Sequence, residues 1–164
     1  SKPVAPARPE EKMAGIIPPK PVADPIPNRA IVAPASRVTA VIVPPYLDSA
    51  SQISTKRSIF FDYDIFTIKS DFVPVLEMHG KYLAANPKIS IRVEGNADER
   101  GSKEYNLALG QKRAEATAQA LVVYGVKTSQ MEAVSWGEEK PKATAHDEAA
   151  YAQNRRVDLG YPSR

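Results

Sequence analysis

One polar run and one later arginine are the parts of this 164-residue sequence whose types and spacing could do chemistry. The run is residues 96–100, and the arginine is Arg113. We predict that the run is a loop between a strand and a helix N-terminus, where backbone N–H groups point outward and ligands often bind. Asp98 supplies an anionic acceptor and Arg113 a planar, bidentate donor. Such a pair suits a zwitterion, with Asp98 facing an ammonium group and Arg113 a carboxylate.

The spacing between the two charges sets a condition on this interpretation. We predict Ser102 as the N-cap of the helix, so Arg113 lies 11 residues further on, or ~16 Å along the helix axis. The loop must therefore fold back along the helix if Asp98 and Arg113 are to meet one ligand. The alternative interpretation is a structural ion-pair network that holds the loop.

Other chemistries have less support in the sequence. Cysteine is absent, which excludes disulfides, thiolate metal sites and a cysteine nucleophile. The glycine-rich phosphate loops and the nucleophile-elbow motif are also missing. His79 lies on the apolar face of a predicted helix and is interpreted as a core histidine, whereas His146 is expected at the surface. We expect neither a metal nor another cofactor.

An enzyme that uses the neighbouring carboxyl groups of Asp98 and Glu99 as acid and base is a further alternative. It is disfavoured because adjacent side chains in a strand or loop tend to point apart, and no nucleophile accompanies them. We therefore expect no catalytic residue.

The elements that must position the charged pair follow from hydrophobic periodicity in residues 58–164. Strands are predicted at 59–63, 89–94, 131–136 and 157–161, and helices at 70–86, 102–125 and 147–153. The apolar faces expected on the two longer helices comprise Phe72, Val75, Leu76, His79 and Leu83, and then Leu107, Ala114, Ala118, Leu121 and Val122. This order indicates an α+β or α/β fold, a small four-stranded sheet with helices mainly on one face. The sheet is expected to be mixed.

The first part of the chain has a different composition. Eleven of the 15 prolines precede Tyr46, and proline lacks the N–H that helices and central strands need. Residues 1–57 carry eight basic and four acidic side chains, a net charge of +4, whereas residues 58–164 have a net charge of −1. We expect 1–57 to be a disordered, flexible tether in front of a domain at 58–164. A proline-motif ligand for a partner domain is the alternative.

Two further expectations come from this division. The apolar, β-branched segment 38–43 could add a strand to a sheet edge, its own or a partner's, or it could be an adhesive stretch within a linker. Nucleic acid is disfavoured as a partner because the net charge of +3 resides in the tether and the folded part lacks a basic aromatic platform.

Several stretches carry a resemblance to a known family. Residues 61–64, 93–101, 104–114, 134–141 and 154–156 are similar to the peptidoglycan-associated lipoprotein (Pal) family, whose folded part is an OmpA-like domain. The resemblance covers essentially all of 58–164, and the proline-rich tail also resembles the variable tether of that family. The fold that it implies is the OmpA-like one, with a four-stranded mixed sheet.

The resemblance implies noncatalytic binding of peptidoglycan. The diamino acid of the stem peptide, meso-diaminopimelate, is then held by the residues at positions Asp98 and Arg113. Further positions that match the groove are Phe61, Asp62, Asn96, Ala97 and Leu109. Arg100 and Asn106 are candidates either for ligand contact or for bracing the loop, and Arg155 is a candidate groove cation.

The resemblance also implies a cellular setting. Members are anchored to the periplasmic face of the outer membrane by a lipidated cysteine, which this chain lacks; we expect the acylated residue to have been trimmed or to precede Ser1. Membership in the Tol-Pal system, which acts in envelope integrity and cell division, would follow. The β-propeller protein TolB would be a partner that competes with the cell wall for one face. The alternative function is a protein-interaction module whose main ligand is such a Tol component.

Overall fold

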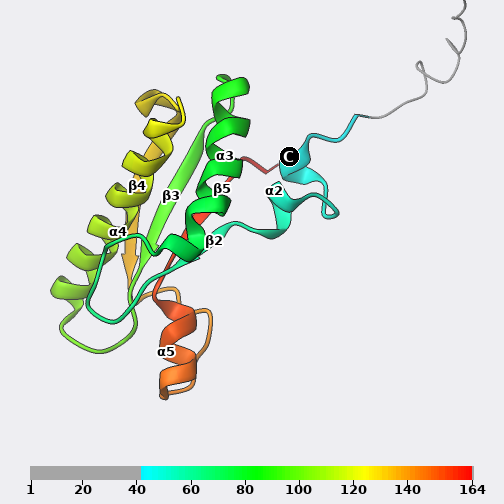
Figure 1. Cartoon of the computed structure of the whole chain (residues 1–164). Coiled ribbons are helices and arrows are strands. Elements are labelled where there is room, and N and C mark those ends of the chain that lie inside the picture. Colours follow the sequence, from blue (N-terminus) through cyan, green and yellow to red (C-terminus); the bar gives the residue numbers. More distant parts are fainter. Residues whose placement is uncertain (1–41, 164) are drawn as a thin grey trace, which may run out of the picture. The chain divides into compact units, whose positions relative to one another are not determined.

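The structure, a computed structural model, describes residues 42–163, so most of the predicted tether and of the segment 38–43 lies outside the described residues. The compact unit begins at Val43. It has the expected α+β architecture, with four strands in one mixed sheet and helices beside it (Figure 1).

The strands are β2 (Ser58–Phe60), β3 (Ile91–Asn96), β4 (Met131–Gly137) and β5 (Arg156–Gly160), in the sheet order β2-β5-β3-β4. β3 and β4 are parallel, whereas β5 runs antiparallel to β2 and to β3. The ends of β2, β3 and β4 and the start of β5 therefore lie at the same end of the sheet. We call it the loop end, and it holds residues 61–69, 97–102, 138–147 and the helix before β5.

The longer helices are α3 (Val73–Ala85) and α4 (Lys103–Val123), and they pack side by side on the sheet (Figure 1). α5 (Glu148–Asn154) lies beyond the loop end, next to the start of β5. The remaining elements are short: α2 (Gln52–Thr55) and the 3-10 turns η1 (Pro45–Leu47), η2 (Ser70–Phe72) and η3 (Thr128–Gln130).

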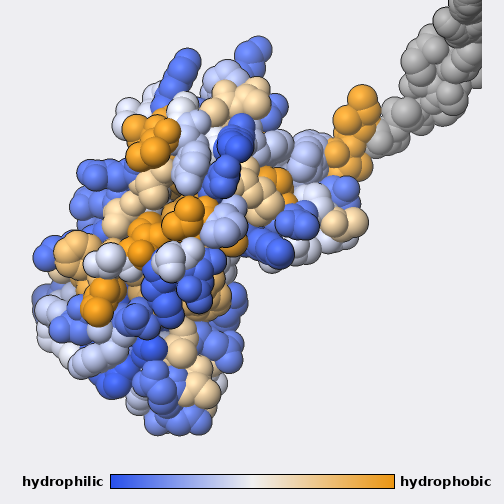
Figure 2. All heavy atoms as spheres, viewed as in Figure 1, coloured by the Kyte–Doolittle hydropathy of each residue, from blue (hydrophilic) through white to orange (hydrophobic). Residues whose placement is uncertain are grey.

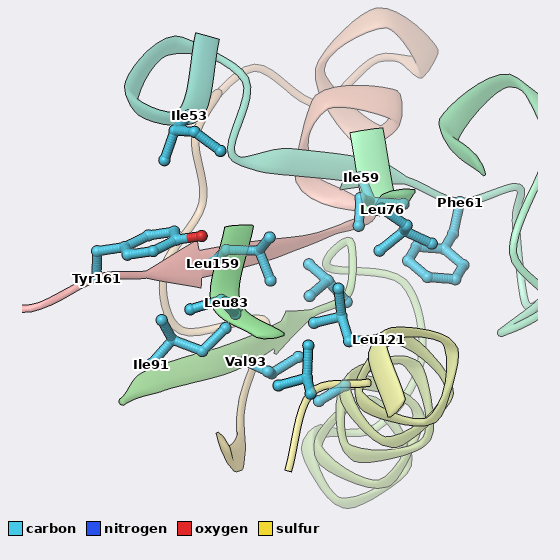
Figure 3. Close-up of a cluster of buried hydrophobic side chains, with 13 residues drawn as sticks. Ile53, Ile59, Phe61, Leu76, Leu83, Ile91, Val93, Leu121, Leu159 and Tyr161 are labelled. Atoms are coloured by element: carbon cyan, nitrogen blue, oxygen red, sulfur yellow. The ribbon is translucent and has the colours of Figure 1, made fainter. Parts of the chain in front are cut away.

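The core lies between the sheet and the helices, because alternate strand residues point toward the helices. Ile59, Val93 and Leu159 from three strands are almost completely buried. They meet Leu76 of α3 and Leu121 of α4 (Figure 3).

Two glycines set the closest approach between helix and sheet. A Cβ on Gly95 of β3 would lie 1.8 Å from the carbonyl oxygen of Gly110 in α4, and a Cβ on Gly110 would lie 2.3 Å from the Ser135 hydroxyl. Neither position has room for a side chain. Because Asn96 follows Gly95, and Arg113 lies about one turn beyond Gly110, this contact brings Arg113 next to the end of β3.

The predicted buried face of α4 is partly wrong. Ala114 and Leu121 are buried as expected, but Leu107 and Val122 are 51% and 41% exposed. The helix instead buries a face that includes three polar side chains, those of Asn106, Arg113 and Thr117, together with Leu109 and Gly110. Hydrophobic periodicity favoured a face displaced by about one residue, because it does not detect polar side chains on a buried face.

The predicted helix ends are mostly confirmed. The Ser102 hydroxyl accepts a hydrogen bond from the Tyr105 N–H, as an N-cap does, and Gly125 follows α4 with a φ of +101°. Ser70 is not an N-cap: it begins η2, and α3 starts at Val73 with Pro74 in its first turn.

The compact unit begins at Val43, earlier than the domain boundary expected after residue 57, because residues 43–57 pack on the sheet. Ile53 is only 8% exposed and joins the core, and the Tyr46 ring stacks on Tyr161 with a centroid distance of 5.5 Å. The Arg57 guanidinium lies 4.9 Å from the Tyr161 ring centre and donates to the Tyr46 carbonyl oxygen. The proline-rich composition of residues 43–57 and their lack of regular hydrophobic periodicity predicted that they belong to the tether. The structure shows that this short segment instead anchors to the sheet.

His79 completes this cluster, which lies at the end of the sheet opposite the loop end. Its ring is fully buried, with Nε2 2.6 Å from the Lys56 carbonyl oxygen and Nδ1 2.7 Å from the Tyr161 hydroxyl. A carbonyl only accepts, so Nε2 carries the proton and Nδ1 accepts from Tyr161. The core-histidine interpretation is confirmed. We call Tyr46, Arg57, His79, Tyr82 and Tyr161 the aromatic cluster.

Candidate functional site

The loop end gathers the predicted site residues around one small pocket of about 60 Å³. It is lined by predicted residues, namely Ala97, Asp98, Arg100, Asn106, Leu109 and Arg113. Phe61, Asp62, Asn96 and Arg155 do not line it but hold the residues that do. A larger hollow of about 590 Å³ elsewhere on the sheet contains none of the predicted residues.

Asp98 lies on the pocket floor, with only 4% of its surface exposed. Its Oδ1 accepts from the Arg100 backbone N–H at 3.0 Å and from Arg100 Nε at 3.1 Å. Its Oδ2 accepts from Arg100 Nη2 at 2.8 Å and from Arg155 Nη1 at 3.4 Å. Burial opposes ionisation, but these hydrogen bonds and charges outweigh it and hold the pKa of Asp98 below its ordinary value. Asp98 is therefore a carboxylate at neutral pH.

Arg113 is completely buried and braces the loop end. It donates from Nε to the Ile65 carbonyl at 2.8 Å, and from its terminal nitrogens to the carbonyls of Asn96 at 2.9 Å and Asp62 at 3.0 Å. Its guanidinium also lies 5.2 Å from the Phe61 ring centre. The loop that folds back along α4 is thus the one after β2, and the guanidinium ties it to the end of β3.

Arg113 keeps its positive charge although it is buried. Burial, and then repulsion from Arg155, lower the pKa of Arg113 to about 10, while Asp98 and Asp64 act in the opposite direction. Arg113 is therefore a cation at neutral pH. Each of its terminal nitrogens has one further N–H beyond the one that a carbonyl accepts.

Arg100 covers Asp98 from the outside. Its guanidinium lies between the rings of Tyr63, at 4.1 Å, and Tyr151, at 4.5 Å. Its Nη2 is also 3.7 Å from Oε1 of Glu148 in α5. The Arg100 side chain is 35% exposed, compared with 4% for that of Asp98.

The other predicted residues are mainly braces. Asn106 is buried and donates to Glu138 at 2.8 Å. Arg155 donates to the Phe61 carbonyl at 2.9 Å and to Glu148 at 2.9 Å.

Asn96 is buried at the end of β3. Its side-chain amide nitrogen donates to backbone carbonyls, whereas its Oδ1 finds no hydrogen-bond partner within residues 42–163. The uncompensated oxygen makes Asn96 a costly residue to bury.

Four lining residues were not predicted from the sequence: Tyr63, Asp64, Gly101 and Tyr105. Tyr63 and Tyr105 form an exposed rim, and the Tyr105 hydroxyl donates to Asp64. Asp64 has a φ of +59°, a left-handed conformation that aspartate tolerates. The alternation of residues 59–63 predicted a strand through residue 63, but β2 ends at Phe60 and the chain then turns.

The arrangement can bind charged groups noncovalently. A buried carboxylate and a buried guanidinium share one floor, and the apolar side chains of Ala97 and Leu109 lie beside them. Figure 2 shows a mostly hydrophilic surface around α5, whereas hydrophobic groups gather over α3 and α4. Within residues 42–163 we find no group of three His, Cys, Asp or Glu side chains placed to hold a metal ion, and no helix that could cross a membrane.

Comparison with known proteins gives consistent results. A model of the OmpA family matches residues 60–155. The chain is 47% identical over 105 residues to the peptidoglycan-associated lipoprotein of Pasteurella multocida, covering 64% of this chain and 70% of that protein. It is 46% identical over 114 residues to that of Pseudomonas putida, covering 68% of each.

Solved structures show the same relationship. The crystal structure of the peptidoglycan-associated lipoprotein from Burkholderia pseudomallei matches with a TM-score of 0.70 and 51% identity, covering 73% of this chain and 100% of that one. The C-terminal domain of Helicobacter pylori MotB, at 24% identity and a TM-score of 0.59 over 65% of this chain and 83% of that one, shares the fold. The chain therefore belongs to the OmpA family, together with the peptidoglycan-associated lipoproteins.

Proposed function

We propose that this domain binds peptidoglycan without cleaving it, and that the pocket takes the free end of meso-diaminopimelate in a stem peptide. The names of the relatives support peptidoglycan as the ligand. The observation that carries the choice of site is that Asp98 and Arg113, two buried and opposite charges, line the same pocket.

The ligand chemistry matches these two groups. The free end of meso-diaminopimelate carries an ammonium and a carboxylate on one carbon. The ammonium would bind Asp98, and the carboxylate would accept the remaining N–H groups of Arg113. The methylene chain would lie on Ala97 and Leu109, which are both buried and apolar.

A binding rather than a catalytic role fits the geometry of the charged groups. Asp98 is engaged by Arg100 and Arg155, and Glu99 accepts from Tyr151 at 2.8 Å and pairs with His146. General acid–base catalysis instead favours a pKa near the working pH, whereas the pKa values of both Asp98 and Glu99 are lowered.

The proposal is tested by cosedimentation of the protein with purified peptidoglycan sacculi. Asp98→Asn keeps the shape of the side chain but removes its charge, and we expect the affinity to fall about tenfold or more. Glu132→Gln, on the exposed part of β4, is the matched control and should bind as the wild type does. Circular dichroism checks that both variants are folded. Unchanged binding of Asp98→Asn would contradict the site.

The proposal includes the setting that the family implies. The protein would act as a lipoprotein on the periplasmic face of the outer membrane, as part of the Tol-Pal system, although the anchoring cysteine is not among its residues. Removal of the lipid-attachment residue from the natural gene, followed by membrane fractionation, tests the anchor. Recovery of the protein in the membrane fraction without that residue would oppose it.

A second candidate is a protein-interaction role with a Tol component such as TolB. The exposed rim side chains Tyr63 and Tyr105 favour it, because tyrosine is enriched in protein interfaces. If both ligands use the pocket, soluble stem peptide should displace TolB from the immobilised domain. If TolB is fully retained at saturating peptide, TolB and the stem peptide bind different surfaces of the domain.

A further inference from the structure

The pocket at the loop end is small. Its volume of about 60 Å³ holds only a few water molecules, which is less than the end of a diamino acid needs. Its floor, made of Asp98, Asn106, Leu109 and Arg113, is buried, so the floor cannot move without loss of packing. The rim is exposed, and a ligand must enter by displacing it.

Arg100 already occupies the place of a ligand cation. Of the four hydrogen bonds that the Asp98 carboxylate accepts, three come from Arg100, and two of these come from its guanidinium. We propose that Arg100 is the resident counter-ion of the pocket, and that a ligand ammonium reaches Asp98 only when the Arg100 guanidinium leaves. This inference rests on the proposed function, which it extends from the identity of the ligand to the control of its entry.

Arg100, and not Arg155, is the arginine that can leave. The Arg100 side chain is 35% exposed and that of Arg155 only 7%. Arg155 is also tied to the Phe61 carbonyl. Arg100 has partners outside the pocket, because the Tyr151 ring and the Glu148 carboxylate belong to α5. A rotation of the side chain moves the guanidinium toward them, while its backbone N–H continues to donate to Asp98.

The exchange selects for ligands that carry a cation. When the guanidinium leaves, the buried carboxylate of Asp98 loses much of its neutralising charge, and a buried, unpaired charge is costly. A ligand with its own ammonium restores that charge, whereas a neutral or acidic peptide cannot. The measured affinity is then the difference between binding to the ligand and binding to Arg100.

Isothermal titration with the tripeptide L-Ala-γ-D-Glu-meso-diaminopimelate tests this exchange. Arg100→Gln removes the resident cation, and we expect it to bind the tripeptide about fivefold to tenfold more tightly than the wild type. Arg92→Gln is the matched control, because Arg92 also pairs with a carboxylate two residues away, that of Glu94, but on the outer face of the sheet. It should bind within about twofold of the wild type.

Each outcome decides between the claims. If the wild type binds the tripeptide and Arg100→Gln binds equally or more weakly, the exchange is wrong and Arg100 is a ligand contact or a brace. If neither protein binds, the proposed function fails and the exchange fails with it. Thermal melts of both variants check folding. In the wild type, the Arg100 Nε–H resonance should shift on addition of the tripeptide; a resonance that does not move would also overturn the exchange.

Discussion

The two ends of the sheet both combine arginine with aromatic rings, but they use the combination differently. In the aromatic cluster, each nitrogen of the His79 ring has one fixed partner, and the group is neutral. At the loop end, Asp98 accepts from two arginines, one of which is partly exposed. Hydrogen bonds to single, fixed partners hold a segment in place, whereas ion pairs with several donors allow one partner to replace another.

The largest effect should follow from Arg113, a completely buried brace at the loop end. Arg113→Ala leaves three backbone carbonyls without a donor and should lower the free energy of unfolding by roughly 3–5 kcal/mol. Denaturant unfolding measures it, with the exposed Arg92→Ala as the control. A loss of less than about 1 kcal/mol would place Arg113 among the exchangeable charges instead.

A smaller effect is expected in the aromatic cluster. Tyr161→Phe removes the hydroxyl that donates to the buried His79 Nδ1 and should cost about 1–2 kcal/mol of unfolding free energy. Tyr105→Phe makes the same change at the exposed rim and should cost less than about 0.5 kcal/mol. Equal losses in the two variants would remove the difference between the two ends.

The pH dependence of stability sharpens the comparison further. Burial lowers the pKa of His79 below its ordinary value of 6.5, so the unfolded chain takes up the proton first as the pH falls. Stability from this group is complete above pH 6.5 and declines as the pH falls toward the folded-state pKa. Unfolding curves between pH 8 and about pH 5 should show this decline, and His79→Gln should flatten it.

The smallest effect concerns the exposed pair at the loop end. Hydrogen bonding to Glu99 and its charge raise the pKa of His146 above 6.5. In a nuclear magnetic resonance titration, His146 should therefore protonate at a higher pH than His79. Glu99→Gln should return His146 toward its ordinary pKa without altering His79. An unchanged His146 titration would show that the pair does not form in solution.

Much of the fold could be predicted because local signals agreed. The alternation of Ile91 and Val157 with polar neighbours indicated strands, and Ser102 and Gly125 marked the ends of α4. The segment 43–57 could not be predicted in the same way, because Tyr46 and Ile53 anchor it by single contacts that leave no periodic pattern.

The clustering of the predicted residues could be anticipated from the sequence, but the hydrogen bonds between them could not. Asp98 and Arg113 were expected to face a ligand together, and both do line the pocket. Their present partners come from distant segments: Ile65 and Asp62 for Arg113, and Arg155 for Asp98. Such contacts depend on the close approach of α4 to β3 at Gly95, which a single sequence does not reveal.

The position of β5 has a mechanical consequence. This interior strand joins the two ends of the sheet, with Arg155 just before it at the pocket and Tyr161 just after it in the aromatic cluster. A pull on residues 43–57 enters the sheet through the chain link from Arg57 to Ser58 at the start of β2, and a pull on Asp98 enters through Ala97 at the end of β3. β5 lies between these two strands, so the load crosses it and shears its hydrogen bonds to β2 and β3 together rather than opening them one after another.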